Sequence, residues 1–93
     1  MTIKKLSAMP YAQARIEIDD NGNIHLYSYY TRGAELDADG WLTVYGLYSA
    51  TTRRHISAFM REYCKPFDYY AAKTCYECNE RLNIHTAEVR ENP

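Results

Sequence analysis

Short runs of alternating apolar and polar residues, separated by turn signals, fill the first half of the chain and restrict its fold most. Residues 14–18 (Ala-Arg-Ile-Glu-Ile) alternate with the period of a half-buried strand. A polar turn around Gly22 follows, and residues 24–30 predict a second strand, so the two runs predict a hairpin. Residues 31–33 (Thr-Arg-Gly) interrupt the pattern and predict a bend or bulge.

A second hairpin signal comes at Asp39-Gly40. Residues 41–48 follow it as the clearest strand, because they are rich in the Trp, Leu, Val and Tyr residues that favour sheets. Both faces of this strand carry apolar bulk, which predicts a central strand or one covered on both sides. The first half of the chain therefore predicts an antiparallel sheet.

Residues 52–63 predict the main helix, which Ser49 or Thr51 can cap. Its apolar residues recur at helical spacing and form one stripe: Ile56, Phe59, Met60 and Tyr63. A shorter helix over residues 67–72 can begin after Pro66, and a Cys-x2-Cys loop follows it. Residues 81–89 alternate only weakly, and they predict one last strand. The last residues, 90–93, read as a frayed tail.

Metal-binding residue types gather in the last third of the chain. Cys75 and Cys78 form a Cys-x2-Cys pair, Cys64 precedes it by ten residues, and His85 follows it. Thiolates and imidazole are ligands that Zn²⁺ prefers, and four of them close a tetrahedral site. His55 is the rival fourth ligand; we favour His85, because its short strand can turn the ring toward the cysteines. Three cysteines cannot all pair as disulfides, which favours a metal.

The expected fold class is therefore α+β: a small antiparallel β-meander of three to four strands packed on one main helix, with a zinc-stapled C-terminal segment. Ninety-three residues predict one domain, in which residues 1–63 form the sheet and helix body and residues 64–93 the Cys/His metal-binding tail. Four protein ligands leave no open position, so this zinc would be structural. Gly-rich phosphate loops and nucleophile motifs are absent, and we expect no enzyme.

Charge and aromatic content bear on the partner. The net charge is −1, from 11 basic and 12 acidic residues, which argues against binding to free nucleic acid. Ten tyrosines are the compositional outlier. Tyrosine and arginine are enriched in interface hot spots. The expected partner-binding residues are Tyr27, Tyr29, Arg53, Arg54 and Arg61, although the tyrosines can equally pack under the helix and the arginines can equally form a solvated helix face.

Part of the chain resembles a group of small uncharacterised phage proteins. The resemblance lies in residues 26–30 (Leu-Tyr-Ser-Tyr-Tyr), in residues 39–49 (Asp-Gly-Trp-Leu-Thr-Val-Tyr-Gly-Leu-Tyr-Ser), and in residues 51–56 (Thr-Thr-Arg-Arg-His-Ile) with Phe59. It implies a phage origin and a strand–turn–strand–helix unit, and it supplies no catalytic residue. His55 falls inside the shared segment, which favours a role in the fold. The cysteine-bearing tail lies outside it.

In size and metal set the chain also resembles the zinc-containing anti-CRISPR proteins that inhibit type II effector nucleases. This resemblance implies a non-enzymatic, zinc-binding inhibitor that binds a host defence protein in the cytoplasm of an infected bacterium. The alternative is a small zinc-stabilised phage regulator that binds nucleic acid. The sequence has no stretch that would span a membrane, and it names neither the target nor the oligomeric state.

Overall fold

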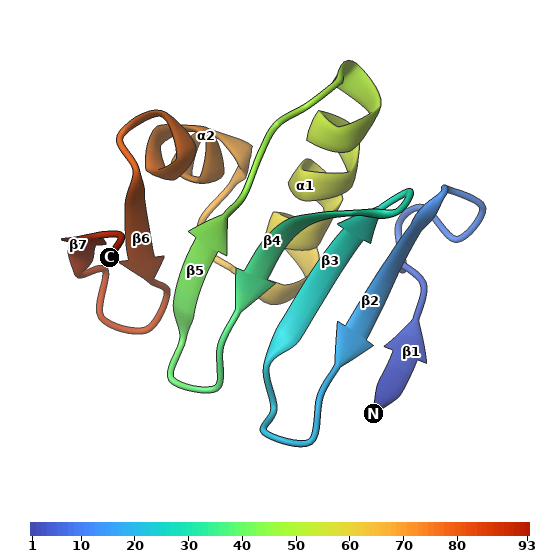
Figure 1. The fold of residues 1–93 in the computed structure, drawn as a ribbon, viewed down its shortest axis with the longest axis horizontal. Helices are drawn as coiled ribbons and strands as arrows, with labels where there is room; N and C mark the ends of the chain where they lie inside the picture. The colour runs from blue at the N-terminus through green and yellow to red at the C-terminus, as the bar shows by residue number, and fades with distance from the viewer.

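The computed structural model describes all 93 residues as one seven-stranded antiparallel sheet with two helices on one face (Figure 1). The strands neighbour one another in sequence order, so the sheet is a continuous meander, with β1 and β7 at opposite edges. The strands are β1 (Thr2–Lys4), β2 (Ala14–Ile18), β3 (Ile24–Ser28), β4 (Thr31–Leu36), β5 (Trp41–Val44), β6 (Glu80–Asn83) and β7 (Val89–Glu91).

The two central hairpins follow the turn signals of the sequence. Gly22 and Gly40 have φ angles of 85° and 94°, which a residue with a Cβ rarely adopts. In each turn an aspartate closes the loop: Asp19 accepts hydrogen bonds from two loop N–H groups, and Asp37 does the same. These local interactions fix the β2–β3 and β4–β5 connections. The predicted irregularity near residue 33 is present as a shift of the β3–β4 register.

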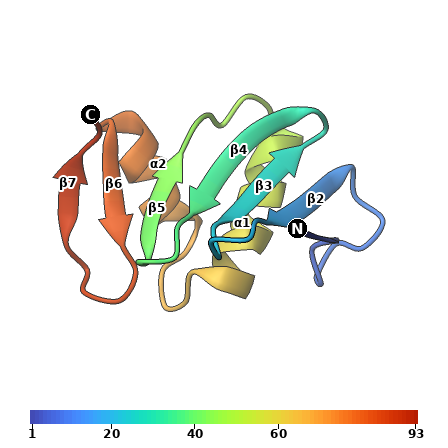
Figure 2. The ribbon, with the colours of Figure 1, turned by 60° about the horizontal axis from the view of Figure 1, so that its bottom comes forward.

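Helix α1 (Ala50–Tyr63) begins at Ser49, whose hydroxyl accepts a hydrogen bond from the Thr52 N–H at 3.2 Å. The predicted apolar stripe faces the sheet, with Ile56, Phe59 and Met60 fully buried. Helix α2 (Tyr69–Glu77) begins at Asp68, which caps it in the same way. Figure 2 shows both helices behind the same face of the sheet, where seventeen buried apolar residues form one core.

The expected meander of three to four strands on one main helix is wrong. The sheet has seven strands and the chain has two helices. The sequence did not predict β1, because its three residues are all exposed and lack the alternating burial that marks a half-buried strand. The weak alternation over residues 81–89 belongs to two strands, because Asn83 Oδ1 accepts from the N–H groups of His85 and Thr86 and turns the chain.

The zinc-stapled C-terminal segment is also wrong as a description of the fold. Strand β6 pairs with β5, and β7 pairs with β6, so backbone hydrogen bonds and the core hold residues 80–91 in the sheet. Residues 75–77, expected in a cysteine loop, form the last turn of α2. Neither helix has the length and apolar character that crossing a bilayer requires.

Candidate interaction surfaces

The four predicted zinc ligands lie in three different environments. Cys64 ends α1 and is fully buried in the core, and Cys75 on α2 is 5% exposed in the same core. Cys78 ends α2 and is exposed. Cys78 precedes the four-residue strand β6 and His85 follows it, so the length of this strand, on the order of 10 Å, separates the two residues. The structure gathers no group of three His, Cys, Asp or Glu side chains that could hold a metal.

The two buried thiols are stabilised in their neutral form in this structure. Burial raises the pKa of Cys64 to about 12, and burial, aided by the neighbouring Glu80 and Cys78 charges, raises the pKa of Cys75. Both side chains act here as small apolar residues of the core. Zinc binding by this set remains a prediction from the sequence.

The predicted partner-binding residues divide between opposite sides of the molecule. Tyr27 lies on the face of the sheet that the helices leave open, opposite Arg15 and Arg32 in the strand register. Arg53, Arg54 and Arg61 are exposed on α1, on the helix side. Tyr29 lies at the β3–β4 turn with a φ of 57°, half exposed and close to the buried His55 ring. The five residues therefore do not form one continuous surface.

The open face carries three clusters in which an arginine stacks on an aromatic ring. The Arg15 guanidinium lies 4.3 Å from the Tyr27 ring centroid, and the Arg32 guanidinium lies 4.2 Å from that of Tyr45. The third cluster is Trp41, with Arg81 at 4.9 Å and Arg90 at 4.8 Å. The clusters extend from β2 to β7, and we refer to their seven residues as the arginine–aromatic face: Arg15, Tyr27, Arg32, Trp41, Tyr45, Arg81 and Arg90.

Carboxylates are interleaved with these clusters. Glu17 pairs with Arg15, and Glu88 pairs with Arg90. His25 lies between Asp19 and Glu35, at 3.2 and 3.3 Å. Arg32 and Arg81 have no carboxylate within ion-pairing distance. The arginine–aromatic face is thus mixed in sign, with two arginines left without an acidic partner.

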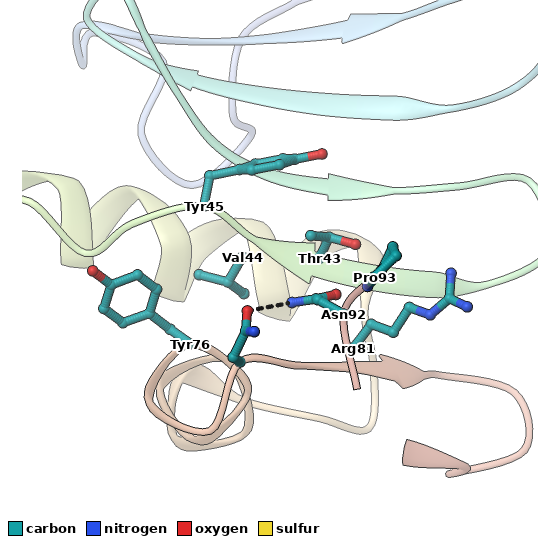
Figure 3. A pocket seen from close by; sticks show the side chains of 8 residues that line it. Thr43, Val44, Tyr45, Tyr76, Arg81, Asn92 and Pro93 are labelled. Atoms are coloured by element: carbon teal, nitrogen blue, oxygen red, sulfur yellow. Dashed lines mark hydrogen bonds between the residues drawn. The ribbon is translucent and has the colours of Figure 1, made fainter. Parts of the chain in front are cut away.

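Arg81 lines a hollow of about 460 Å³, together with Tyr45, on whose ring Arg32 stacks (Figure 3). Thr43 and Tyr45 contribute from β5 and the residue after it, Arg81 from β6, and Tyr76 from the end of α2. Val44, Asn79, Asn92 and Pro93 complete the lining, and the Asn92 amide donates to Asn79 Oδ1 at 3.3 Å. Asn79 has a φ of 54°, which places it in the tight turn between α2 and β6.

Of the seven residues of this face, only Tyr27 was among the partner-binding residues expected from the sequence. The usable signal was the hairpin register: aligning residues 14–18 against residues 24–28 sets Arg15 beside Tyr27, on the face opposite the apolar Ile16 and Leu26. The cluster around Trp41 was not accessible in this way, because Arg81 and Arg90 lie 40 and 49 residues farther along the chain and reach the ring only through the β5–β6–β7 pairing.

The fold and this surface together define a small α+β protein with a meander sheet, helices on one face and an arginine–aromatic face on the other. The chain belongs to a family of unknown function, DUF8033, whose model matches residues 2–75. The expected membership of an uncharacterised family is confirmed at that level. The match ends inside α2, so β6 and β7 lie outside it. No curated protein and no solved structure matches the chain.

Proposed function

We propose that this protein is a non-enzymatic binding protein that contacts another protein through its arginine–aromatic face. The observation that supports the proposal is the set of three stacked clusters across β2 to β7. Tyr, Trp and Arg are the residue types over-represented in interface hot spots. Stacking holds each arginine on its ring, so part of the side-chain entropy that binding would cost is already lost.

The charge distribution favours a protein partner over a nucleic acid. Glu17 and Glu35 lie among the arginines of the face, and the whole chain has a net charge of −1. A polyphosphate backbone would be repelled by these carboxylates, whereas a protein surface can offer both signs of charge. The unpaired Arg32 and Arg81 would meet carboxylates of the partner.

The resemblance to small phage proteins extends the proposal to a phage protein that blocks a host defence protein inside the infected cell. A type II CRISPR effector nuclease is the particular target we propose. Two features support this target: the chain is small, and a blocking protein needs no catalytic site. The zinc set adds nothing to it, because the structure does not gather the four side chains.

The test uses the purified protein with a purified type II effector nuclease loaded with guide RNA. We expect a complex by size-exclusion chromatography and a slower rate of target cleavage. Arg32→Glu should weaken binding by about tenfold or more, because it reverses an unpaired charge on the face. The matched control is Arg54→Glu, an exposed arginine on the helix side, which should bind as the wild type does.

Two results would overturn the proposal in different ways. If the nuclease neither binds nor slows, the type II target is wrong. If the protein instead shifts single-stranded DNA or RNA in a gel, and Arg32→Glu abolishes the shift, the face binds nucleic acid and the rings of Tyr27, Trp41 and Tyr45 act as stacking surfaces for bases. Equal effects of Arg32→Glu and Arg54→Glu would show that the face is not the interface.

A further inference from the structure

The hollow beside Tyr45 has a buried cationic donor without a partner. Arg81 is the one charged side chain among those that line it. Its Nε is buried and makes no hydrogen bond, and Arg81 has no ion pair. A buried donor left unsatisfied costs free energy, and a guanidinium recognises a planar or tetrahedral oxyanion with two parallel hydrogen bonds. Arg81 therefore gives the hollow one cationic side chain that has no anionic partner.

Strand alternation keeps carboxylates away from this anion position. Glu80 and Glu91 flank Arg81 in the β6–β7 register, and they pair with each other across the ladder, so they share the opposite face of the sheet. Glu80 lines a separate apolar hollow with Phe67 and Leu82. No side chain of the lining is acidic, and the carboxylate of Pro93, which also lines the hollow, makes no ion pair with Arg81.

The other walls fit a planar ring. Tyr45 and Tyr76 lie at one end of the hollow in Figure 3, Arg81 lies toward the other end, and Asn92 lies between Tyr76 and Arg81. The tyrosines are 36% and 45% exposed, so their rings are available for stacking. The amides of Asn79 and Asn92 and the Thr43 hydroxyl add hydrogen-bonding groups between ring and anion.

We infer that this hollow binds a nucleoside monophosphate, with its base against Tyr45 and Tyr76 and its phosphate on Arg81. The volume of about 460 Å³ lies within the range of small-molecule sites. The same chemistry is present in a free mononucleotide and in the phosphorylated end of a single strand. The hollow shares Arg81 and Tyr45 with the arginine–aromatic face but takes a different ligand, and the nucleotide test and the nuclease test can each fail without the other.

Isothermal titration calorimetry of the full chain with adenosine and uridine monophosphates tests the site. Adenosine alone and inorganic phosphate alone should each bind about tenfold more weakly than the nucleotide, because each makes half of the contacts. Trp41 is the single tryptophan and contacts Arg81, so its fluorescence should change with the nucleotide. A nucleotide that binds no better than inorganic phosphate would overturn the inference.

Variants separate the two halves of the site. Arg81→Gln should weaken the nucleotide by about tenfold and leave adenosine unchanged, whereas Tyr45→Leu should weaken adenosine and nucleotide alike. Lys73→Gln and Tyr70→Leu are the matched controls, because both residues are exposed on α2 at the helix side, and they should bind as the wild type does. Nucleotide binding that survives Arg81→Gln in a folded protein would place the ligand elsewhere.

A short single-stranded oligonucleotide with a terminal phosphate identifies the source. If it binds about as tightly as the mononucleotide, the ligand is a free nucleotide. If it binds about tenfold more tightly, and Arg81→Gln removes that gain, the ligand is a strand end. Failure of all nucleotides while the nuclease complex forms would overturn this inference and leave the proposed function intact.

Discussion

The Ser28 hydroxyl lies 2.8 Å from Nδ1 of His55, inside the layer between the sheet and α1. Ser28 is 2% exposed and His55 is 1% exposed. Thr52 Oγ1 lies 3.0 Å from the same hydroxyl, and Ser49 continues the chain of hydrogen bonds to the helix N-terminus. This buried network joins β3 to α1 through polar atoms. It also explains why a histidine sits within the apolar stripe of the helix.

The network predicts a loss of stability in mild acid. Burial lowers the pKa of His55 below its usual value of about 6.5, so the folded state keeps the ring neutral where the unfolded state takes up a proton. The contribution to the free energy of unfolding is fully present above about pH 6.5 and is lost as pH falls toward the lowered pKa. Urea unfolding measured at intervals between about pH 7.5 and 5 should show this slope.

Two variants check the assignment of that slope. His55→Gln should flatten the pH dependence, whereas His85→Gln, at an exposed position, should leave it unchanged. Ser28→Ala should lower the free energy of unfolding by about 1–2 kcal/mol, because it leaves the buried Nδ1 without its partner. A slope that persists in His55→Gln would assign the acid sensitivity to other groups.

Serine substitutions at the buried and the exposed cysteine should have unequal effects on stability. Cys64→Ser places a hydroxyl in the apolar core and should cost about 1–3 kcal/mol of stability. Cys78→Ser changes an exposed side chain and should stay within about 0.5 kcal/mol of the wild type. A strong chelator should leave the thermal midpoint in place. Equal losses from both serines, together with a midpoint that falls on chelation, would restore the zinc clamp.

The features predicted correctly depend on residues close together in the sequence, whereas the features missed depend on contacts between residues far apart in it. The Gly22 and Gly40 turns and the Ser49 cap depend on neighbouring residues, so the pattern of a few residues revealed them. The seventh strand and the position of His85 depend on how β6 joins β5, which no local pattern encodes. The cysteines looked like ligands because composition cannot distinguish a thiol in the core from one at a metal.

Gly40 and His85 predict a coupled steric effect. Gly40 has a φ of 94°, and a Cβ added there would press against the His85 ring, 2.9 Å from Nε2. Gly40→Ala should cost about 1–3 kcal/mol, partly from the backbone and partly from the ring. In a His85→Ala background the cost should fall by about 0.5 kcal/mol or more, because the clash with the ring is removed and only the backbone strain and the 3.2 Å approach to Asn83 Oδ1 remain. Additive losses in the double-mutant cycle would contradict the contact.

The pKa of the Tyr45 phenol should respond to the charges of two neighbours on the same face of the sheet, Arg32 and Glu35. Burial raises the pKa of Tyr45 above its usual value of about 10, and Glu35 raises it further, whereas Arg32 lowers it by stabilising the phenolate. Arg32→Gln should therefore raise the Tyr45 pKa, and Glu35→Gln should lower it. Ten tyrosines require a residue-resolved measurement, such as NMR titration of ring carbons with Tyr45→Phe to assign the signal. An unchanged Tyr45 titration in Arg32→Gln would mean that the guanidinium does not stack on this ring in solution, and the preorganised cluster on which the proposed interface depends would be absent.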